Sequence, residues 1–416
     1  MSSTLHPDPH GALDLLRDMI QVDSRTETPG EGELARRLVD RMRDAGLETE
    51  LIPVSPGRFN AVGRLRGTGG GESLMFNGHL DTNPLTEGWT VDPWGGVTDD
   101  RFVYGLGVSN MKAGCASYLA AVETLLAHGT RLRGDVVLTF VVGELQGGVG
   151  TLKLIGEGLR ADHFVNCEPT DLNALTLHAG SVHFSIELTG ATRHLSKREE
   201  AVDAIMAACE LIPRINAMTF GGAANAEHRS VHRANVGVIR GALSREFNET
   251  RPPQVADIVR LSGAARFAPS QNPEDVLGDI RSLFETELLP RFPGLGAEVG
   301  RHGPESGKPD FPPFAADLDP AVVRAVAAAH HEVRGTDQAN GPLTPYCFYG
   351  SDAGHLMHSA GMSGVVCGPG GRYNTMPDER VDIVDYLDAV RMHLATMLRI
   401  CGAADIADGN SGVARP

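Results

Sequence analysis

The sequence predicts an α/β protein in which a mixed sheet flanked by helices is interrupted by an inserted domain with a different strand pattern. Helical and strand patterns alternate through the first 180 residues, the order changes to βαββαβ near residue 181, and helical patterns return after residue 305. Alternating helices and strands are typical of a sheet that is covered by helices. We therefore expect one domain from residues 1–180 and 305–416 and a second from residues 181–304.

The first domain opens with two amphipathic helical patterns and continues with strands. We expect helices at residues 12–22, 33–45 and 111–128, and strands at residues 49–53, 60–66, 73–77 and 135–142. The strand at 135–142 is rich in Val, Leu and Phe, which indicates burial on both faces. The glycine-rich run at 67–71 predicts a hairpin turn, because no helix follows it as a phosphate-binding loop requires.

The inserted domain is expected to be an open-faced sandwich of one sheet and two helices. Its strands are predicted at residues 181–188, 235–240, 255–267 and 297–301, and its helices at residues 199–212 and 273–288. The proline- and glycine-rich residues 303–313 predict a crossover back to the first domain. Helices at 319–333 and 385–401 and a disordered tail at 407–416 complete the chain.

Composition argues against several classes of function. The 416 residues include 37 Lys and Arg against 53 Asp and Glu, a net charge of −16, and such a surface repels nucleic acid. The chain has no apolar run long enough for a bilayer and no signal-peptide pattern, so we expect no membrane partner and a cytoplasmic location. The six cysteines form no CxxC pair and are expected to be buried, reduced thiols.

A histidine and an aspartate at the end of a predicted strand suggest a metal site. His79 and Asp81 are two residues apart, so on a strand their side chains point to one face. The Asp81 carboxylate would then accept one imidazole N–H, fix the tautomer and leave the other nitrogen for a metal. Without further ligands, such a pair is more often a structural hydrogen bond, and the rest of the chain must decide.

Eight motifs follow one another along the chain. They are GHLDT (78–82), WTVDPWGG (89–96), GLGVSNMKAG (105–114), GELQGGVGT (143–151), CEPT (167–170), TGATRHLS (189–196), GSDAGHL (350–356) and GPGGRYNTMPDERV (368–381). Together they resemble the di-zinc aminoacylase and carboxypeptidase family, which includes acetylornithine deacetylase and succinyl-diaminopimelate desuccinylase. The resemblance covers residues 15–400. It implies a zinc-peptidase-like catalytic domain with a ferredoxin-like lid or dimerisation domain, and a homo-oligomer that is at least a dimer.

The resemblance also implies roles for four residues of the first domain. His79 and Glu168 match two ligands of one metal, and Asp81 matches the residue that supports His79. Glu144 matches the general base that takes a proton from water. Its apolar neighbours predict that Glu144 is partly buried, whereas the alternative is an acid at a strand end that faces solvent.

Three other positions of the family's metal site carry different residues here. Asn110 stands where an aspartate bridges two metals, Leu145 where a second ligand follows the base, and Asn374 or Thr375 where a histidine is expected. An amide offers one neutral oxygen and leucine offers none. We therefore expect a single, weakly bound divalent ion (Zn, Mn or Co), with Asn110 as a third ligand or, alternatively, as a capping amide of the helix at 111–128.

Three residues of the inserted domain match positions that contact substrate in the family. His194 matches a lid histidine that stabilises the oxyanion of the intermediate, and otherwise it caps a loop. Arg266 matches an arginine that binds a substrate carboxylate, and Asn235 lies near another polar contact to substrate. Asn374 and Thr375 are further candidates for substrate binding.

These residues support a hydrolase that cleaves a C–N bond of a small carboxylate substrate with one labile metal. One specific hypothesis is the deamination of 5-nitroanthranilate to 5-nitrosalicylate, because a nitro-activated ring needs less help from a metal than an amide does. The alternatives are an N-acyl amino acid deacylase or dipeptidase, a binding protein that has lost its metals, and metal-free acid–base chemistry by Glu144 and His194.

Overall fold

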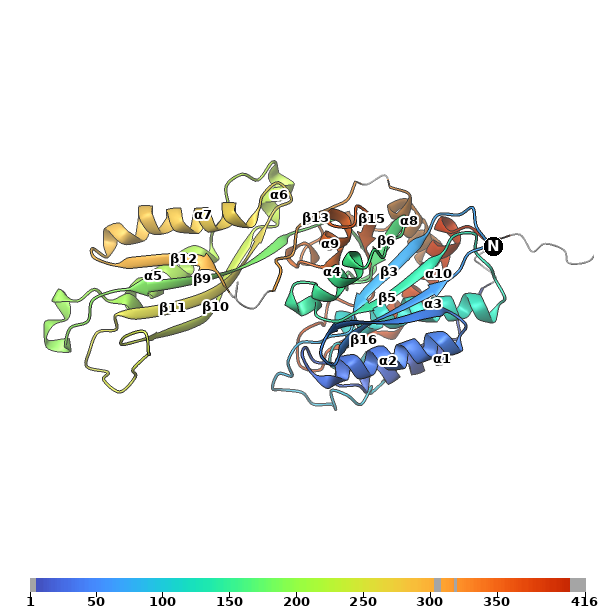
Figure 1. Cartoon of the computed structure of the whole chain (residues 1–416), viewed down its shortest axis with the longest axis horizontal. Helices are drawn as coiled ribbons and strands as arrows, with labels where there is room; N and C mark the ends of the chain where they lie inside the picture. The colour runs from blue at the N-terminus through green and yellow to red at the C-terminus, as the bar shows by residue number, and fades with distance from the viewer. Residues whose placement is uncertain (1–4, 303–307, 318–319, 405–416) are drawn as a thin grey trace, which may run out of the picture. The chain divides into compact units, whose positions relative to one another are not determined.

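The chain forms two compact units in a computed structural model that describes residues 5–302, 308–317 and 320–404 (Figure 1). The first unit comprises Met1–Thr176, Ala316–Gly341 and His355–Pro416, and the second comprises Leu177–Ala315 and Pro342–Gly354. The predicted tail at 407–416 lies outside the described residues. So do residues 303–307 of the predicted crossover and residues 318–319 at the start of the helix that follows it.

The first unit is built on a mixed sheet with the strand order β1-β2-β5-β3-β6-β15-β7-β14. The strands are β1 (Glu48–Ser55), β2 (Arg58–Leu65), β3 (Leu74–His79), β5 (Val136–Val141), β6 (His163–Asn166), β7 (Ala174–Leu175), β14 (Asn340–Gly341) and β15 (Ser363–Val366). The order β5-β3-β6-β15 is parallel, while β1, β2 and β5 pair antiparallel. The predicted mixed α/β fold is therefore confirmed.

Helices cover this sheet and give its two faces different characters. They are α1 (Pro9–Ile20), α2 (Pro29–Asp44), α3 (Ala113–Ala127), α4 (Val149–Gly156), α8 (Ala321–Arg334) and α10 (Ile383–Ile400). Phe76 and Leu138 point into an apolar core shared with α1, α2, α3, α8 and α10. Since side chains alternate along a strand, their neighbours Asn77 and Thr139 point to the other face. There the Asn77 amide donates to Thr139 and to Thr151 of α4, which places polar groups on this face.

The second unit contains a four-stranded antiparallel sheet with the order β10-β11-β9-β12. Its elements are β9 (Gly180–Thr189), α5 (Ala204–Asn216), α6 (Ala226–Ser230), β10 (Arg233–Ala242), β11 (Ile258–Phe267), α7 (Pro273–Leu283) and β12 (Gly296–Arg301). Apolar residues of β9 and β11, such as Phe184 and Leu261, share one core with α5 and α7. The principal elements follow the βαββαβ order of a ferredoxin-like sandwich.

Smaller elements complete the two units. Two-stranded pairs join β4 (Phe102–Tyr104) to β16 (Arg380–Asp382) in the first unit and β8 (Leu177–His178) to β13 (Phe314–Ala315) in the second. The short helix α9 (Asp352–His358) follows Pro342–Ser351.

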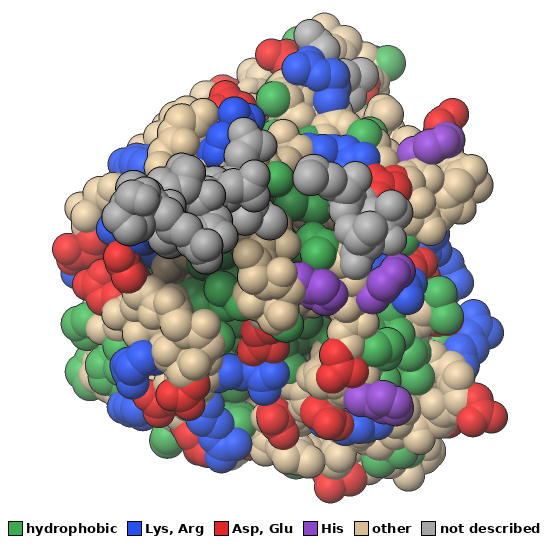
Figure 2. Space-filling view, turned by 90° about the vertical axis from the view of Figure 1, so that its right-hand side faces the viewer, with side chains coloured by type: hydrophobic (Ala, Val, Ile, Leu, Met, Phe, Trp, Pro, Cys, Tyr) green, Lys and Arg blue, Asp and Glu red, His purple; other side chains and the backbone are tan. Residues whose placement is uncertain are grey.

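No helix among the described residues is long and apolar enough to cross a membrane. Acidic and basic side chains are interspersed on the face shown in Figure 2.

Two predicted helices differ from the structure at their starts. The helix predicted at 111–128 is preceded by a π-helical turn, Val108–Lys112, and α3 itself begins at Ala113. The helix predicted at 199–212 is a 3-10 segment, Leu195–Glu200, followed by α5. Asp203 separates them, because its side chain accepts from the first N–H groups of α5 and so begins a new helix.

Two further predictions are wrong. Residues 67–71 do not form a hairpin turn, since β5 lies between β2 and β3 and the two flanking strands never pair. The six cysteines are all free thiols, but Cys209 is exposed while the other five are buried. Cys209 lies on the solvent side of α5, where the apolar stripe formed by Ala207, Ala208 and Leu211 does not reach.

Candidate active site

The parallel strands β3 and β6 bring His79 and Glu168 together. Asn77 of β3 pairs in register with Asn166 of β6, and the Asn166 amide donates to the Asn77 side chain over 2.8 Å. His79 and Glu168 each follow two residues later, so both extend the polar face of the sheet at the same edge. Only 1% of His79 and 4% of Glu168 are exposed, so both groups are shielded from bulk solvent.

Glu144 reaches the same edge from the turn after β5. Gly143 adopts φ 74° and turns the chain out of the strand into a 3-10 segment, Glu144–Gln146. This left-handed conformation is easily adopted by glycine. Glu144 is 6% exposed, as the sequence predicted from its apolar neighbours.

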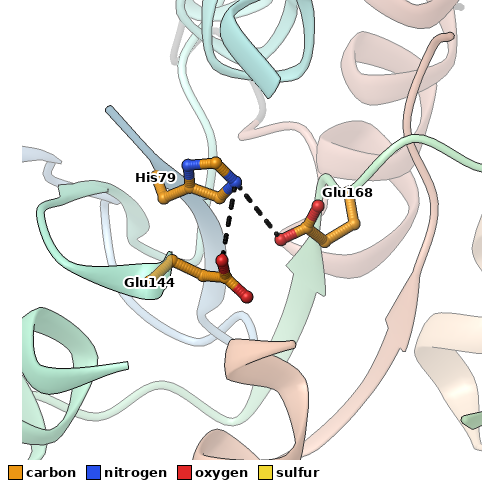
Figure 3. Close-up of side chains that lie close together, drawn as sticks. All are labelled: His79, Glu144 and Glu168. Atoms are coloured by element: carbon orange, nitrogen blue, oxygen red, sulfur yellow. Dashed lines mark ion pairs between the residues drawn. The ribbon is translucent and has the colours of Figure 1, made fainter. Parts of the chain in front are cut away.

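His79, Glu144 and Glu168 form one compact cluster (Figure 3). Nε2 of His79 lies 3.7 Å from Oε1 of Glu168 and 3.9 Å from Oε2 of Glu144. One ligand atom from each of the three residues lies within 4.8 Å of the other two. No other group of three or more metal-ligating His, Cys, Asp and Glu side chains occurs in the described part of the chain.

Asp81 supports this cluster differently from the prediction. Nδ1 of His79 lies 2.8 Å from the main-chain oxygen of Asp81 but 3.7 Å from its carboxylate, so the carboxylate is not the hydrogen-bond acceptor. The reason is that β3 ends at His79 and Asp81 no longer follows the strand. Its carboxylate instead accepts from the N–H groups of Glu144 and Leu145 over 3.2 and 3.1 Å. Asp81 therefore holds the turn that carries Glu144.

The chemistry of these groups fits a divalent cation. A carbonyl oxygen can only accept, so Nδ1 of His79 carries a proton, which leaves Nε2 to face the two carboxylates and the Asn110 oxygen. A bound cation would balance the negative charge of the two carboxylates. Burial raises the pKa of Glu168, while His79 lowers it and Asp81 raises it further. One imidazole and two carboxylates are ligands that Zn and Mn accept in proteins.

Asn110 lies beside the cluster. Its Oδ1 is 3.2 Å from Nε2 of His79, and its side chain makes no capping hydrogen bond to α3, whose N-cap residue is Lys112. The capping alternative is therefore wrong. Leu145 is half-buried and offers the cluster no donor atom, and its main-chain N–H serves Asp81.

The remaining predicted residues lie outside the three-residue cluster. Asn374 and Thr375 lie in the loop before β16, half-buried and exposed respectively. Arg266 of β11 is paired with Arg233 of β10, and Asn235 with Ala264, so Arg266 and Asn235 are diagonal neighbours on one face of the second unit's sheet.

His194 also belongs to the second unit, where it precedes a 3-10 segment. Nδ1 of His194 accepts from the Ser196 N–H over 3.2 Å, so a neutral ring carries its proton on Nε2. His194 therefore caps the loop, as the alternative interpretation predicted. In a neutral ring this contact leaves an N–H donor at Nε2.

Sequence reasoning missed the residues that fix the turns around the cluster. Arg58 binds the buried Glu31 and also donates to Gln146, which belongs to the turn of Glu144. Glu379 accepts from main-chain N–H groups around Asn110. Glu379 lies within the last quoted motif, but its partners are backbone groups about 270 residues away, and no side-chain pattern signals them.

Comparison with known proteins identifies relatives over most of the chain. Residues 75–399 match the model of peptidase family M20/M25/M40. The chain is 26% identical over 391 residues to N-formyl-4-amino-5-aminomethyl-2-methylpyrimidine deformylase of Bacillus subtilis, covering 86% of this chain and 87% of that protein. It is 31% identical over 264 residues to a succinyl-diaminopimelate desuccinylase of Methylorubrum extorquens, covering 58% and 68%.

A solved structure extends the likeness in fold. The M20 family metallo-carboxypeptidase Sso-CP2 from Sulfolobus solfataricus superposes with a TM-score of 0.75, covering 94% of this chain and 99% of that one. The two sequences are 17% identical, so this likeness concerns the fold.

Proposed function

The chain belongs to peptidase family M20/M25/M40, a family of hydrolases that act on C–N bonds, and on this premise we propose that it cleaves an amide-type C–N bond of a small carboxylate substrate with a single divalent metal ion. The observation that carries the proposal is the buried cluster of His79, Glu144 and Glu168. Two buried carboxylates that converge on Nε2 of His79 support a bound cation, while Leu145 and the Asn374–Thr375 loop argue against a second one.

In this proposal His79 and Glu168 hold the ion, and the Asn110 oxygen is its third protein ligand. Such an ion, when bound, polarises the substrate carbonyl and makes water more acidic. Zn, Mn and Co all suit this donor set. With one neutral amide in place of a carboxylate, the ion is expected to exchange readily.

Glu144 moves the proton. Its carboxylate takes a proton from the attacking water while the water oxygen bonds to the carbonyl carbon, and it gives that proton to the nitrogen as the C–N bond breaks. The products are a carboxylic acid and an amine, and the acid then loses its proton to give a carboxylate. Asp81 fixes the main chain of Glu144 and so keeps the carboxylate beside His79 during both transfers.

Residues of the second unit are proposed to bind the substrate. By the resemblance, the Nε2–H of His194 would donate to an oxyanion, Arg266 to a substrate carboxylate and Asn235 to another polar group of the substrate. The activities named for the reported relatives, a deformylase and a desuccinylase, favour removal of a small acyl group from nitrogen over deamination of an arylamine. The 5-nitroanthranilate hypothesis gains no support from them.

The decisive experiment compares wild type with Glu144→Gln. Metal affinity is measured by calorimetry with Zn²⁺, Mn²⁺ and Co²⁺, and turnover is measured on N-formyl, N-acetyl and N-succinyl amino acids, dipeptides and 5-nitroanthranilate. We expect metal-dependent turnover that falls by roughly 10²–10⁴-fold in the variant because the general base is lost. Glu157→Gln, an exposed glutamate paired with Lys153, is the matched control and is expected to keep full activity.

The outcomes separate the alternatives. Turnover without any metal would point to acid–base chemistry alone, and metal binding without turnover on the whole panel would point to a binding protein. A large loss of metal affinity in Glu144→Gln would assign Glu144 as a ligand rather than the base, which its 3.9 Å distance to His79 also permits.

A further inference from the structure

A buried carboxylate organises the main chain that carries Asn110. Glu379 is 3% exposed and lies directly before β16. Its Oε1 accepts from the N–H groups of Ser109 and Asn110 over 2.9 and 3.0 Å, and its Oε2 accepts from that of Gly107 over 3.2 Å. A carboxylate that receives several main-chain N–H bonds makes strong, charge-assisted contacts.

The turn held in this way is otherwise irregular. Gly107 adopts φ 73° and Asn110 departs from helical geometry with φ −122° and ψ 90°. A second tie comes from the Oγ of Ser109, which accepts from the Gly371 N–H over 2.9 Å. Both ties lead to the segment between residues 371 and 379, so this segment fixes the conformation of the turn.

The turn in its hydrogen-bonded conformation brings Asn110 to the cluster. The Oδ1 of Asn110 lies 3.2 Å from Nε2 of His79 while its N–H is held by Glu379. A neutral amide is attracted to a cation more weakly than a carboxylate is, so Asn110 depends on its main chain for its position. Once that main chain is fixed, only the two side-chain torsions of Asn110 remain to be ordered on binding.

We propose that Glu379 is a positioning residue that holds the Asn110 oxygen in place for the metal ion, and this inference rests on the proposed function. Glu379 does not itself touch the ion. Its contribution is to reduce the ordering that Asn110 must undergo, as outer partners of metal ligands do. Glu379 could not be predicted from the sequence, because it accepts hydrogen bonds from main-chain N–H groups rather than from side chains.

A double-mutant cycle tests this inference. The dissociation constant of Co²⁺, with the visible spectrum of the bound ion, is measured for wild type, Glu379→Gln, Asn110→Ala and the double variant. Glutamine has an NH₂ group in place of one carboxylate oxygen. This NH₂ group cannot accept a hydrogen bond from a main-chain N–H. In the protein that keeps Asn110, we expect Glu379→Gln to weaken Co²⁺ binding about tenfold and to change the Co²⁺ spectrum. In the Asn110→Ala variant, we expect Glu379→Gln to have no further effect.

The controls distinguish this inference from a general loss of structure. Asp162→Asn removes a carboxylate that accepts the Ser73 N–H on another loop, and it is expected to leave Co²⁺ binding unchanged. If Glu379→Gln does not fold, Ser109→Ala removes the other tie and goes through the same cycle, with an expected loss of a few-fold that again disappears without Asn110.

Two results would overturn the inference. They are an equal loss from Glu379→Gln in both backgrounds, or an unchanged dissociation constant in Asn110→Ala. In either case wild type still binds Co²⁺ and the proposed function stands. If wild type binds no divalent ion at all, the proposed function fails first, and the two failures are thus told apart.

Discussion

At the scale of single residues, His393 shows how burial sets a pH dependence. It lies on α10, 2% exposed, with its ring edge-on to Phe76 at 4.9 Å and its Nε2 3.8 Å from Sγ of Cys167. Desolvation lowers the pKa of His393 to about 3 from 6.5. The folded protein therefore keeps this ring neutral, while the unfolded chain protonates it below pH 6.5.

This pKa predicts an acid-dependent loss of stability. Between pH 6.5 and 3 the unfolded state binds the extra proton, so the free energy of unfolding falls as pH falls, by about 2 kcal/mol from pH 7 to 5. His393→Leu should remove that part of the fall. Urea unfolding at pH 7 and pH 5, followed by tryptophan fluorescence, measures it, because Trp89 and Trp94 lie in the same unit as His393.

The exposed His10 of α1 provides the control, and His10→Leu should unfold like wild type at both pH values. An identical pH dependence in His393→Leu and wild type would contradict the assignment of this loss to His393.

The residue scale also shows what sequence could predict of the site. His79, Glu144 and Glu168 were predicted because they lie in motifs that resemble those of a metallohydrolase family, and parallel pairing of β3 and β6 then brings two of them together. The acceptor of the His79 N–H was not predictable in the same way, because it is the carbonyl of Asp81 and depends on where β3 ends.

At the scale of elements, a buried ion pair joins α2 to β2. Arg58 and Glu31 share two contacts of 2.7 Å, with side chains 12% and 0% exposed. Removing one partner leaves a buried charge without compensation. Arg58→Leu is therefore expected to lower the free energy of unfolding by about 3–5 kcal/mol, measured by urea denaturation.

The double variant Arg58→Leu with Glu31→Leu should recover most of this loss, because an apolar pair needs no charge compensation. Arg37→Leu, which breaks the exposed pair with Glu33 on the same helix, should cost less than about 1 kcal/mol. A similar small cost for Arg58→Leu would show that Glu31 finds another partner or becomes neutral.

Most elements of the first unit were predictable from periodicity, since amphipathic helices and apolar strands carry their own pattern. The failures lie where long-range pairing decides. The connection at 67–71 depends on β5 entering between β2 and β3, and the start of α3 depends on the π-helical turn at Val108–Lys112, which Glu379 holds from the C-terminal part of the chain.

At the scale of the whole molecule, metal binding should stabilise the first unit in particular, since His79, Glu144 and Glu168 all belong to it. An ion at about 100 times its dissociation constant adds about 2.7 kcal/mol to the stability of the state that binds it. We expect Zn²⁺ to slow amide hydrogen exchange in β3, β5 and β6 more than in β9 and β11, measured by mass spectrometry.

His79→Ala should abolish this protection, because it removes the imidazole ligand. Equal protection in both units, or protection that persists in His79→Ala, would indicate that Zn²⁺ acts at other places on the surface.

The segmented construction of the first unit has a consequence for biosynthesis. β6 ends at Asn166, but its neighbour β15 begins only at Ser363, so at ~5–20 residues per second the ribosome needs about 10–40 s to supply the missing strand. During that time one edge of β6 is unpaired in the nascent chain, although His79, Glu144 and Glu168 have already been synthesised. The interval is one in which a growing polypeptide is prone to aggregate and benefits from chaperones.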